Sequence, residues 1–494
     1  LIGSGDLGLE TGGMQVPNAE PSNIAWYPSG FRKAQPTPIA KRRGSLAAQP
    51  PRTMSIDTRQ IFRDNFELLE SGIGIPSSTP LHELRRQAFE RFNQLGVPTS
   101  RHEEWRFTPL SPLTSTTFTP VPGQSSTPAS LPLRTLGFDD PEAHQLVFID
   151  GIYAPSLSRF HPIVEGLVLS GLADALQSEE ATVIIAHLER SASTERDAFL
   201  ALNTAFVRDG AYVRIADGVN VERPIHLLFL STSVDTAIAS HPRTLIVAGT
   251  DASATIIEEY SGIEGGHYFT NPATDLVLGE RARITHCKLQ HESPKGVHIG
   301  AFNALQSSQS TLKSVTVTFG SALVRNNTGT ILNGEGAHAT LDGLYVVGRS
   351  QTVDNHTTID HAVANCTSHE LYKGILDGDG RGVFSGKIIV RQDAQKTDSK
   401  QSNSNLLLSN EAVIDTKPQL DIFADDVKCT HGATIGQLDE KQIFYLRSRG
   451  IDREEARGIL TYAFASDIID RVDDEAARVW LDGLLAERLD RGKG

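Results

Sequence analysis

The chain has 494 residues, of which 39% are apolar, and this is enough for a large buried core in about two to four structural units. Its 60 acidic side chains outnumber the 46 basic ones, and the net charge of -14 argues against nucleic acid or anionic membrane surfaces as partners. The three cysteines are odd in number and widely spaced, which excludes a disulfide framework and is typical of a reducing compartment.

Residues 1–53 are rich in Gly, Pro, Ser and Arg and lack a hydrophobic period, whereas the sequence from Met54 onward reads as an ordinary protein start. We therefore expect a disordered leader or translated upstream sequence. A transit peptide is the alternative, because basic residues outnumber acidic ones there, although the amphipathic period is poor. No run of about 18 apolar residues and no export signal occurs, so we expect a soluble cytoplasmic protein, or a plastid protein if the leader is a transit peptide.

A helical region is predicted over residues 54–115. Its clearest helix begins at Thr79 and Pro80, which suit the cap and the first turn, and it ends at Gly96. Apolar residues recur every three to four positions between them and form one face, which must pack on another element. These residues are Leu81, Leu84, Ala88, Phe89, Phe92 and Leu95. Residues 116–144 are predicted to form a linker, because Ser, Thr and Pro are frequent and large apolar side chains are few.

Residues 145–436 change to short strands with alternating or β-branched apolar content, each bounded by Gly, Asn, Asp or Ser. Hairpin turns of the Asn-Gly or Asp-Gly type are scarce, and no long helical segment interrupts the strands after about residue 240. Short strands rich in Asn, Thr and Gly favour a parallel β-helix, in which each coil buries one face on its neighbour. A β-sandwich is the alternative. The fold prediction is a mainly β protein, with a parallel β-helix core flanked by N-terminal and C-terminal α-helical regions.

Residues 437–494 return to a helical pattern. Asp439 with Gln442, and Asp452 with Glu455, have the spacing of capping boxes at two helix starts. Two apolar stripes follow. They consist of Ala456, Ile459, Leu460, Ala463, Phe464 and Ile468, and of Ala477, Trp480, Leu481, Leu484 and Leu485. Helices of this kind usually cap a β core, and the functional alternative is that they present a docking surface to a partner.

Three segments resemble motifs that bind small ligands, but each lacks residues or neighbouring elements that the motif requires. Gly3, Gly5 and Gly8 have the spacing of a dinucleotide fingerprint, but only two residues precede them, so no strand leads into the turn. The segment 382–390 looks like a phosphate loop but lacks its first Gly and the Ser or Thr that ligates magnesium. Residues 376–382 lack the third acid and the closing Glu of a calcium loop. The sequence therefore predicts neither nucleotide nor calcium binding by this chain.

His356, His361, Cys366 and His369 lie close together in the sequence and are all ligands for borderline or soft metals. On strands whose side chains alternate between two faces, their spacing places them on opposite faces. No tetrahedral spacing of the zinc type is present. We interpret them as polar side chains of β-helix coils and turns, and keep an autonomous iron-binding protein as the alternative.

The longest informative stretch is "DDVKCTHGATIGQLDEKQIFYLRSRGI" at residues 425–451. It resembles the C-terminal signature of SufD-type members of the SufB/SufD family, which are scaffold proteins of the SUF iron-sulfur cluster assembly system. Further segments that are similar to this family lie at 383–409, 368–376, 148–158 and 95–110. The matches are co-linear and run from about residue 55 to residue 494, so the resemblance includes all of the chain except the leader.

Cys429 and His431 lie in the Cys-Thr-His-Gly-Ala-Thr core of this signature. On an extended strand, residues two apart project on one face about 6 to 7 Å from each other. Thiolate and imidazole are ligands that iron and iron-sulfur species prefer. The resemblance implies that His431 is a transient metal ligand in a cluster-building site shared with a paralogous SufB subunit, whose Cys supplies the main ligand. Structural and functional roles remain equally open for Cys429, since a buried thiol is often inert.

A SufB-like scaffold is the nearer alternative within the family. The SufB pattern carries a Cys before "LL" and acids on both sides of the His. Here Ser402 stands where that Cys would align, and Thr430 and Gly432 flank His431. The thiolate and the paired carboxylates are missing, so the SufD type fits better and this chain alone is not expected to nucleate a cluster.

The resemblance also implies partners and an absence of catalysis by this chain. SufB would be the heterodimer partner, and ATPase activity would reside in SufC, which would dock on the C-terminal helices through Ile459, Tyr462, Phe464 and Trp480. The cofactor would be a nascent iron-sulfur cluster held transiently at the interface. Reduced flavin is associated with complexes of this family, but no flavin motif occurs and no flavin site is assigned. A polysaccharide-active β-helix enzyme is the alternative from another class, and the lack of an export signal argues against it.

Overall fold

A computed structural model describes residues 58–72, 80–121, 137–193 and 197–491. The predicted leader, the predicted cap Thr79 and much of the predicted linker lie outside these ranges. The domain boundaries drawn from the sequence therefore stay predictions.

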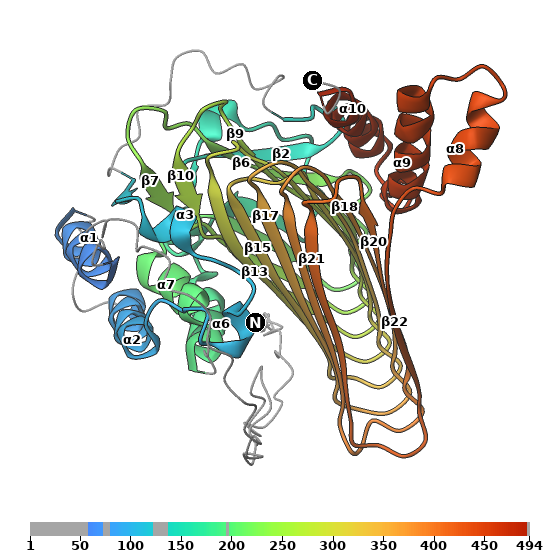
Figure 1. The fold of residues 1–494 in the computed structure, drawn as a ribbon. Helices are drawn as coiled ribbons and strands as arrows, with labels where there is room; N and C mark the ends of the chain where they lie inside the picture. The colour runs from blue at the N-terminus through green and yellow to red at the C-terminus, as the bar shows by residue number, and fades with distance from the viewer. Residues whose placement is uncertain (1–57, 73–79, 122–136, 194–196, 492–494) are drawn as a thin grey trace, which may run out of the picture. The chain divides into compact units, whose positions relative to one another are not determined.

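The described elements run from helices through a long series of strands and back to helices (Figure 1). The first elements are α1 (Thr58–Gly72), α2 (Pro80–Leu95), η1 (Glu103–Trp105), α3 (Ser111–Thr114), β1 (Thr119–Pro120), β2 (His144–Ile149), β3 (Ile152–Tyr153), η2 (Pro155–Leu157), β4 (Leu167–Gly171), α5 (Leu172–Ala175), α6 (Ala181–Ser193) and α7 (Ala198–Phe206). The strands that follow are β5 (Ala211–Ile215), β6 (Ile225–Ser231), β7 (Ile238–Ser240), β8 (Arg243–Ala248), β9 (Ser253–Gly262), β10 (Tyr268–Thr270), β11 (Ala273–Leu278), β12 (Arg283–His291), β13 (Val297–Gln306), β14 (Thr311–Thr318), β15 (Leu323–Leu332), β16 (His338–Val347), β17 (Thr352–His361), β18 (Thr367–Leu376), β19 (Arg381–Val390), β20 (Asp398–Leu407), β21 (Val413–Ile422) and β22 (Lys428–Gly436). The last elements are α8 (Glu440–Arg447), α9 (Arg453–Ile469) and α10 (Glu475–Arg491).

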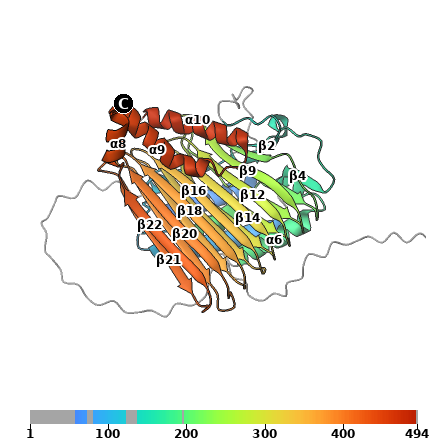
Figure 2. The same cartoon turned by 90° about the vertical axis from the view of Figure 1, so that its right-hand side faces the viewer.

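Two sheets form the walls of a parallel β-helix. One has the order β21-β19-β17-β15-β13-β11-β8-β5-β4, and the other the order β22-β20-β18-β16-β14-β12-β9-β6-β2-β3. From β11 to β22, successive strands of the chain alternate between the sheets, so each of these strands pairs with the strand one coil further on, as Figure 2 shows for the second sheet. Within the described residues, only the pairs β2–β3 and β4–β5 are antiparallel. The predicted β-helix class is confirmed, and the β-sandwich alternative is wrong.

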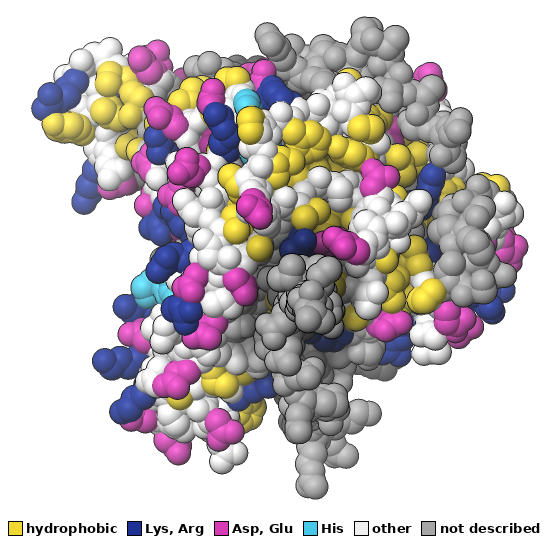
Figure 3. All heavy atoms as spheres, turned by 180° about the vertical axis from the view of Figure 1, so that it is seen from behind, with side chains coloured by type: hydrophobic (Ala, Val, Ile, Leu, Met, Phe, Trp, Pro, Cys, Tyr) yellow, Lys and Arg dark blue, Asp and Glu magenta, His cyan; other side chains and the backbone are white. Residues whose placement is uncertain are grey.

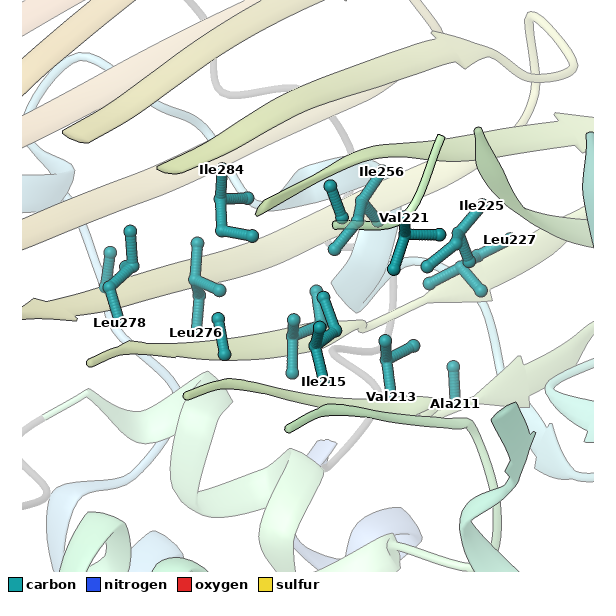
Figure 4. Packing of buried hydrophobic residues seen from close by; sticks show 14 of the residues in the cluster. Ala211, Val213, Ile215, Val221, Ile225, Leu227, Ile256, Leu276, Leu278 and Ile284 are labelled. Atoms are coloured by element: carbon teal, nitrogen blue, oxygen red, sulfur yellow. The ribbon is translucent and has the colours of Figure 1, made fainter. Parts of the chain in front are cut away.

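Aliphatic side chains fill the N-terminal half of the β-helix interior. Side chains of β5 and β11 lie opposite those of β6, β9 and β12 (Figure 4). Ile225, Ile246 and Ile256 are fully buried there. Burial of each such side chain stabilises the fold by about 1.5–3 kcal/mol. This packed half holds the early coils, and a second buried apolar cluster, which includes Val353, Ile359 and Ile388, lies in the later coils.

Three helices that the sequence analysis did not predict lie within residues 172–206. In α7, every residue except Leu200 is buried, and the carboxylate of Asp197 caps the helix by accepting from the N–H groups of Phe199 and Leu200. An evenly apolar helix of this length gives no amphipathic period, so its sequence does not distinguish it from a buried strand. The aromatic face of α2 packs in the same cluster as α7, and Gly96, with φ +68°, ends α2 as predicted.

The C-terminal helices begin at the predicted caps. Asp439 accepts from the N–H of Lys441, and Asp452 from that of Glu455. Apolar side chains of α9 and α10 pack with those of β12, β14, β16 and β18, and Figure 2 shows both helices lying across that sheet. Helix α8 contacts α9 and stands away from the strands (Figure 1). Among the described helices, none has the length and apolar character needed to cross a membrane.

Candidate functional site

The β-helix ends at an open edge. Strand β22 pairs with β20 on one side, and the other side of β22 has no strand partner among the described residues. Strand β21 has the same position in the other sheet, where it pairs with β19. Every residue of β22 is exposed except Cys429, which is half-buried. An edge of this kind presents free backbone N–H and C=O groups for pairing.

Cys429 and His431 both lie on the interior-facing row of β22. In register, Cys429 pairs with Ser399 and His431 with Gln401, and both β20 residues are buried between the two sheets. Cys429 packs against the apolar cluster of the last coils. His431 has the same facing, because side chains two apart on a strand point to the same side. It is nevertheless exposed, since no further coil covers it.

The thiol of Cys429 is held in its neutral form. Burial raises its pKa, the nearby carboxylate of Asp398 acts in the same direction, and a backbone hydrogen bond at Ser399 opposes them. At neutral pH this group is therefore a protonated thiol and a weaker metal ligand than a thiolate. The imidazole of His431 is the better available ligand of the two.

A row of polar side chains lies directly beneath the edge. Ser399, Gln401, Asn403 and Asn405 of β20 all face inward and are buried. The Nδ2 of Asn405 donates to Oδ1 of Asn403 at 2.6 Å, and the Nδ2 of Asn403 donates to the backbone oxygen of Tyr372 at 3.2 Å. Sequence reasoning missed this row. Alternate polar residues in "SKQSNSN" are a signal for it, but they become informative only once the register shows which set faces inward.

Glu370 of β18 continues this polar row one strand deeper. It is in register with Gln401, whose Nε2 donates to its Oε2 at 2.7 Å. Burial raises the pKa of Glu370 to about 7, against the opposing effects of Thr357 and Gln401. A carboxyl group that is partly protonated at neutral pH thus lies two strands below the exposed edge.

The four candidate ligands near residue 360 are dispersed. His356 lies between the carboxylates of Glu104 and Asp354, with nitrogen–oxygen distances of 3.2 and 3.1 Å. His361 is buried and its Nε2 lies 2.9 Å from Oγ of Ser368. Cys366 is buried, with its thiol directed at the backbone oxygen of Gly334, and His369 is exposed. Across the described part of the chain, no three His, Cys, Asp or Glu side chains gather into a metal site.

The four predicted docking residues divide into two kinds. Ile459 and Tyr462 of α9 are 42% and 38% exposed. Phe464 instead packs on the core with Lys373 over its ring at 4.7 Å, and Trp480 packs edge-to-face with His291 at 4.7 Å between ring centres. Phe464 and Trp480 therefore hold α9 and α10 on the chain's own sheet.

Two exposed aromatic residues on α8 were missed by the sequence analysis. Phe444 and Tyr445 are 72% and 55% exposed. They belong to the projection that α8 forms, which carries hydrophobic side chains at the upper left of Figure 3. The segment "KQIFYLRSRG" contains these apolar residues, but the helix is too short for a repeating pattern to separate an exposed face from a buried one.

Comparisons with known proteins agree with this architecture. The family model described as SufBD protein N-terminal region matches residues 56–227, and the one described as SUF system FeS cluster assembly, SufBD core domain, matches residues 229–464. The iron-sulfur cluster assembly protein SufD of Escherichia coli is 32% identical over 82% of this chain and 93% of its own length. An iron-sulfur cluster assembly SufBD family protein of Synechocystis is 36% identical over 78% of this chain and 86% of its own length. The chloroplastic protein ABCI7 of Arabidopsis thaliana is 30% identical over 88% of this chain and 94% of its own length.

These matches confirm the resemblance drawn from the signature at residues 425–451, and the similarity to a protein named SufD agrees with the SufD-type reading. The chain belongs to the SufB/SufD family of the SUF system for iron-sulfur cluster assembly.

Proposed function

We propose that this chain is a non-catalytic scaffold subunit that pairs with a SufB-type paralogue and contributes His431 to a cluster-building site at their interface. The observation that carries the proposal is the placement of His431, exposed on the last strand of an open β-helix. An imidazole there is within reach of a neighbouring subunit and remains attached to a rigid sheet. Imidazole nitrogen is a ligand for iron and for iron-sulfur species.

The open edge supports pairing between two β scaffolds. Strand β22 contains no proline, so each of its residues can donate or accept a backbone hydrogen bond. Strand β21, the other terminal strand, contains Pro418, which has no N–H to donate. Addition of a partner strand at β22 would continue the sheet by main-chain hydrogen bonds. A shared sheet would also place His431 beside the ligands of the partner.

The nascent cluster is cargo in this proposal, and Cys429 has a secondary role. Its raised pKa disfavours the thiolate, so ligation by Cys429 would require loss of a proton when iron binds. The main sulfur ligand would therefore come from the partner, as the family resemblance implies. Under this division, the described part of the chain, in which no metal site is assembled, would act as a scaffold that lends one ligand.

The C-terminal helices are proposed to dock the SufC ATPase. Ile459 and Tyr462 present an exposed apolar surface on α9, and Phe444 and Tyr445 extend it on α8. Phe464 and Trp480, also predicted as docking residues, support this surface from beneath by packing on the core. Nucleotide hydrolysis in the docked ATPase would then move the paired scaffolds. The cytoplasm stays the predicted compartment, with a plastid as its alternative.

The test is replacement of His431 by alanine in the full complex. His431→Ala is expected to leave folding and complex formation intact and to abolish cluster maturation in cells, since an exposed side chain supports no core packing. His369→Ala is the matched control, because His369 is an exposed histidine on the outer face of the same sheet. Normal maturation with His431→Ala, or equal loss with both variants, would exclude the interface role.

A further inference from the structure

A buried amide lies in register with His431 on the neighbouring strand. Gln401 is 2% exposed, and its Cα is the strand partner of His431. Its Nε2 donates to Oε2 of Glu370 at 2.7 Å, whereas its Oε1 is buried and has no hydrogen-bond partner among the described residues. A buried amide oxygen normally accepts a hydrogen bond, so this one requires a physical explanation.

The position of this amide is fixed from two sides. Glu370 holds its nitrogen, and Gly386 on the opposite sheet leaves the space that the amide occupies. A Cβ added at Gly386 would lie 2.3 Å from Nε2 of Gln401 and 2.8 Å from its Cδ. Gln401 therefore reaches across the interior, and its nitrogen, which donates to Glu370, leaves its oxygen as the group without a partner. The free acceptor is held in one place beneath the terminal strand.

We propose that Gln401 is a positioning residue for His431, with Oε1 of Gln401 accepting the N–H of one imidazole nitrogen. Residues in register on adjacent strands face the same side and lie about 4.8 Å apart, which brings these two side chains within reach. The ring of His431 makes no hydrogen bond to the described residues as it stands. Rotation about its side-chain torsions, which is fast for an exposed residue, is the movement that the proposed contact requires.

The consequence is a defined tautomer. A histidine that donates one ring N–H to a fixed acceptor presents its other nitrogen, with a lone pair, as the ligand. Gln401 thus selects which nitrogen of His431 faces the cluster. This inference rests on the proposed function of His431, but the hydrogen bond itself is measurable without any cluster.

The first test is the tautomer of His431 in the full-length chain, measured by nuclear magnetic resonance with nitrogen-15 histidine. His431→Asn identifies its signals. One dominant tautomer is expected in the wild type, and the mixture typical of a free imidazole in Gln401→Met. Gln306→Met is the matched control, because Gln306 is also a buried glutamine, and its partners are Thr330, Ser310 and the backbone of His338. A free-imidazole mixture in the wild type, or no change in Gln401→Met, overturns the proposal.

A second pair of variants moves the amide without removing it. Gly386→Ala is expected to shift the tautomer as Gln401→Met does, by displacing the amide. Gly329→Ala should leave the tautomer unchanged, since the nearest atom to its added Cβ is 3.5 Å away. The exchanged pair Gln401→Glu with Glu370→Gln keeps one amide and one carboxylate in contact and should restore the dominant tautomer. Failure of this pair to restore it argues against an acceptor role and for simple packing.

Cluster maturation in cells gives the second readout. Gln401→Met is expected to lower the yield on the order of tenfold, as loss of partners that orient metal ligands commonly does, and the exchanged pair should recover it. If cells with His431→Ala mature clusters normally, the proposed function is wrong. The tautomer measured in the wild type would still show whether the hydrogen bond between His431 and Gln401 forms. If His431→Ala stops maturation and Gln401→Met changes neither tautomer nor yield, the positioning role alone is overturned.

Discussion

At the scale of single residues, the open end of the β-helix combines one exposed histidine with buried polar groups. His431 is exposed, whereas Gln401 and Glu370 below it are buried among the last coils. Burial of a carboxyl group favours its neutral form, and this explains why the pKa of Glu370 rises to about 7. The group is therefore a source of pH dependence within the folded state near neutrality.

Glu370 is predicted to destabilise the fold progressively as the pH rises from 4.5, its ordinary pKa, to about 7. In this window the folded chain holds a proton that the unfolded chain releases, so stability that is present below pH 4.5 is lost. A shift of this size corresponds to about 3 kcal/mol at most. Glu370→Gln removes the titration and should gain stability relative to the wild type from about pH 5 to about pH 7.5, as measured by urea unfolding. If the free energies of unfolding of the two proteins change in parallel with pH, the raised pKa of Glu370 is contradicted.

At the scale of elements, the C-terminal helices have one face on the core and another face exposed. Trp480 and Phe464 pack inward on the core. Phe444 and Tyr445 lie exposed on α8, a short helix whose main contacts are with α9. Isolated apolar side chains are common on protein surfaces, but a projecting helix with two adjacent exposed aromatics is typical of a docking surface.

Phe444→Asp with Tyr445→Asp is expected to weaken capture of the SufC ATPase by at least about tenfold, because aromatic side chains are enriched among interface hot spots, each of which contributes about 2 kcal/mol or more. Thermal stability should change little, since neither side chain is buried. Phe160→Asp is the control, as Phe160 is an exposed phenylalanine far from α8 in the chain. Pull-down with tagged chain measures the effect, and undiminished capture by the double variant would place the dock elsewhere.

At the scale of the whole molecule, the β-helix was predictable and its interior was not. Short strands punctuated by Gly, Asn and Asp, with few hairpin turns, indicate stacked coils. His431 was singled out only through the family signature, because an exposed histidine on a strand carries no distinctive period. Gln401 and Glu370 were missed, since their inward facing depends on a register that the sequence does not reveal. Trp480 was predicted as a docking residue, and its packing on the core was not foreseen, because an amphipathic stripe does not say which surface covers it.

The same limit applies to the helices α5, α6 and α7 near the start of the strand series. They lie in the range that was predicted to belong to the β core. The sequence of α7 is a short apolar run that fits a buried strand equally well. In the structure, α7 packs against α2 and also contacts α1, α6 and β13. Local sequence patterns therefore predict coils where turn residues mark them, and fail where only tertiary contacts select helix over strand.

Hydrogen exchange of β22 in the assembled complex tests the central claim most directly. Its outward backbone N–H groups lack a strand partner in the described chain, so they should exchange fast in the isolated protein. Pairing with a SufB-type strand should slow them by about tenfold or more, equivalent to about 1.4 kcal/mol of protection, while β4, the edge strand at the opposite end of the other sheet, stays unchanged. Exchange in β22 that is equally fast with and without the partner would contradict an interface at this edge.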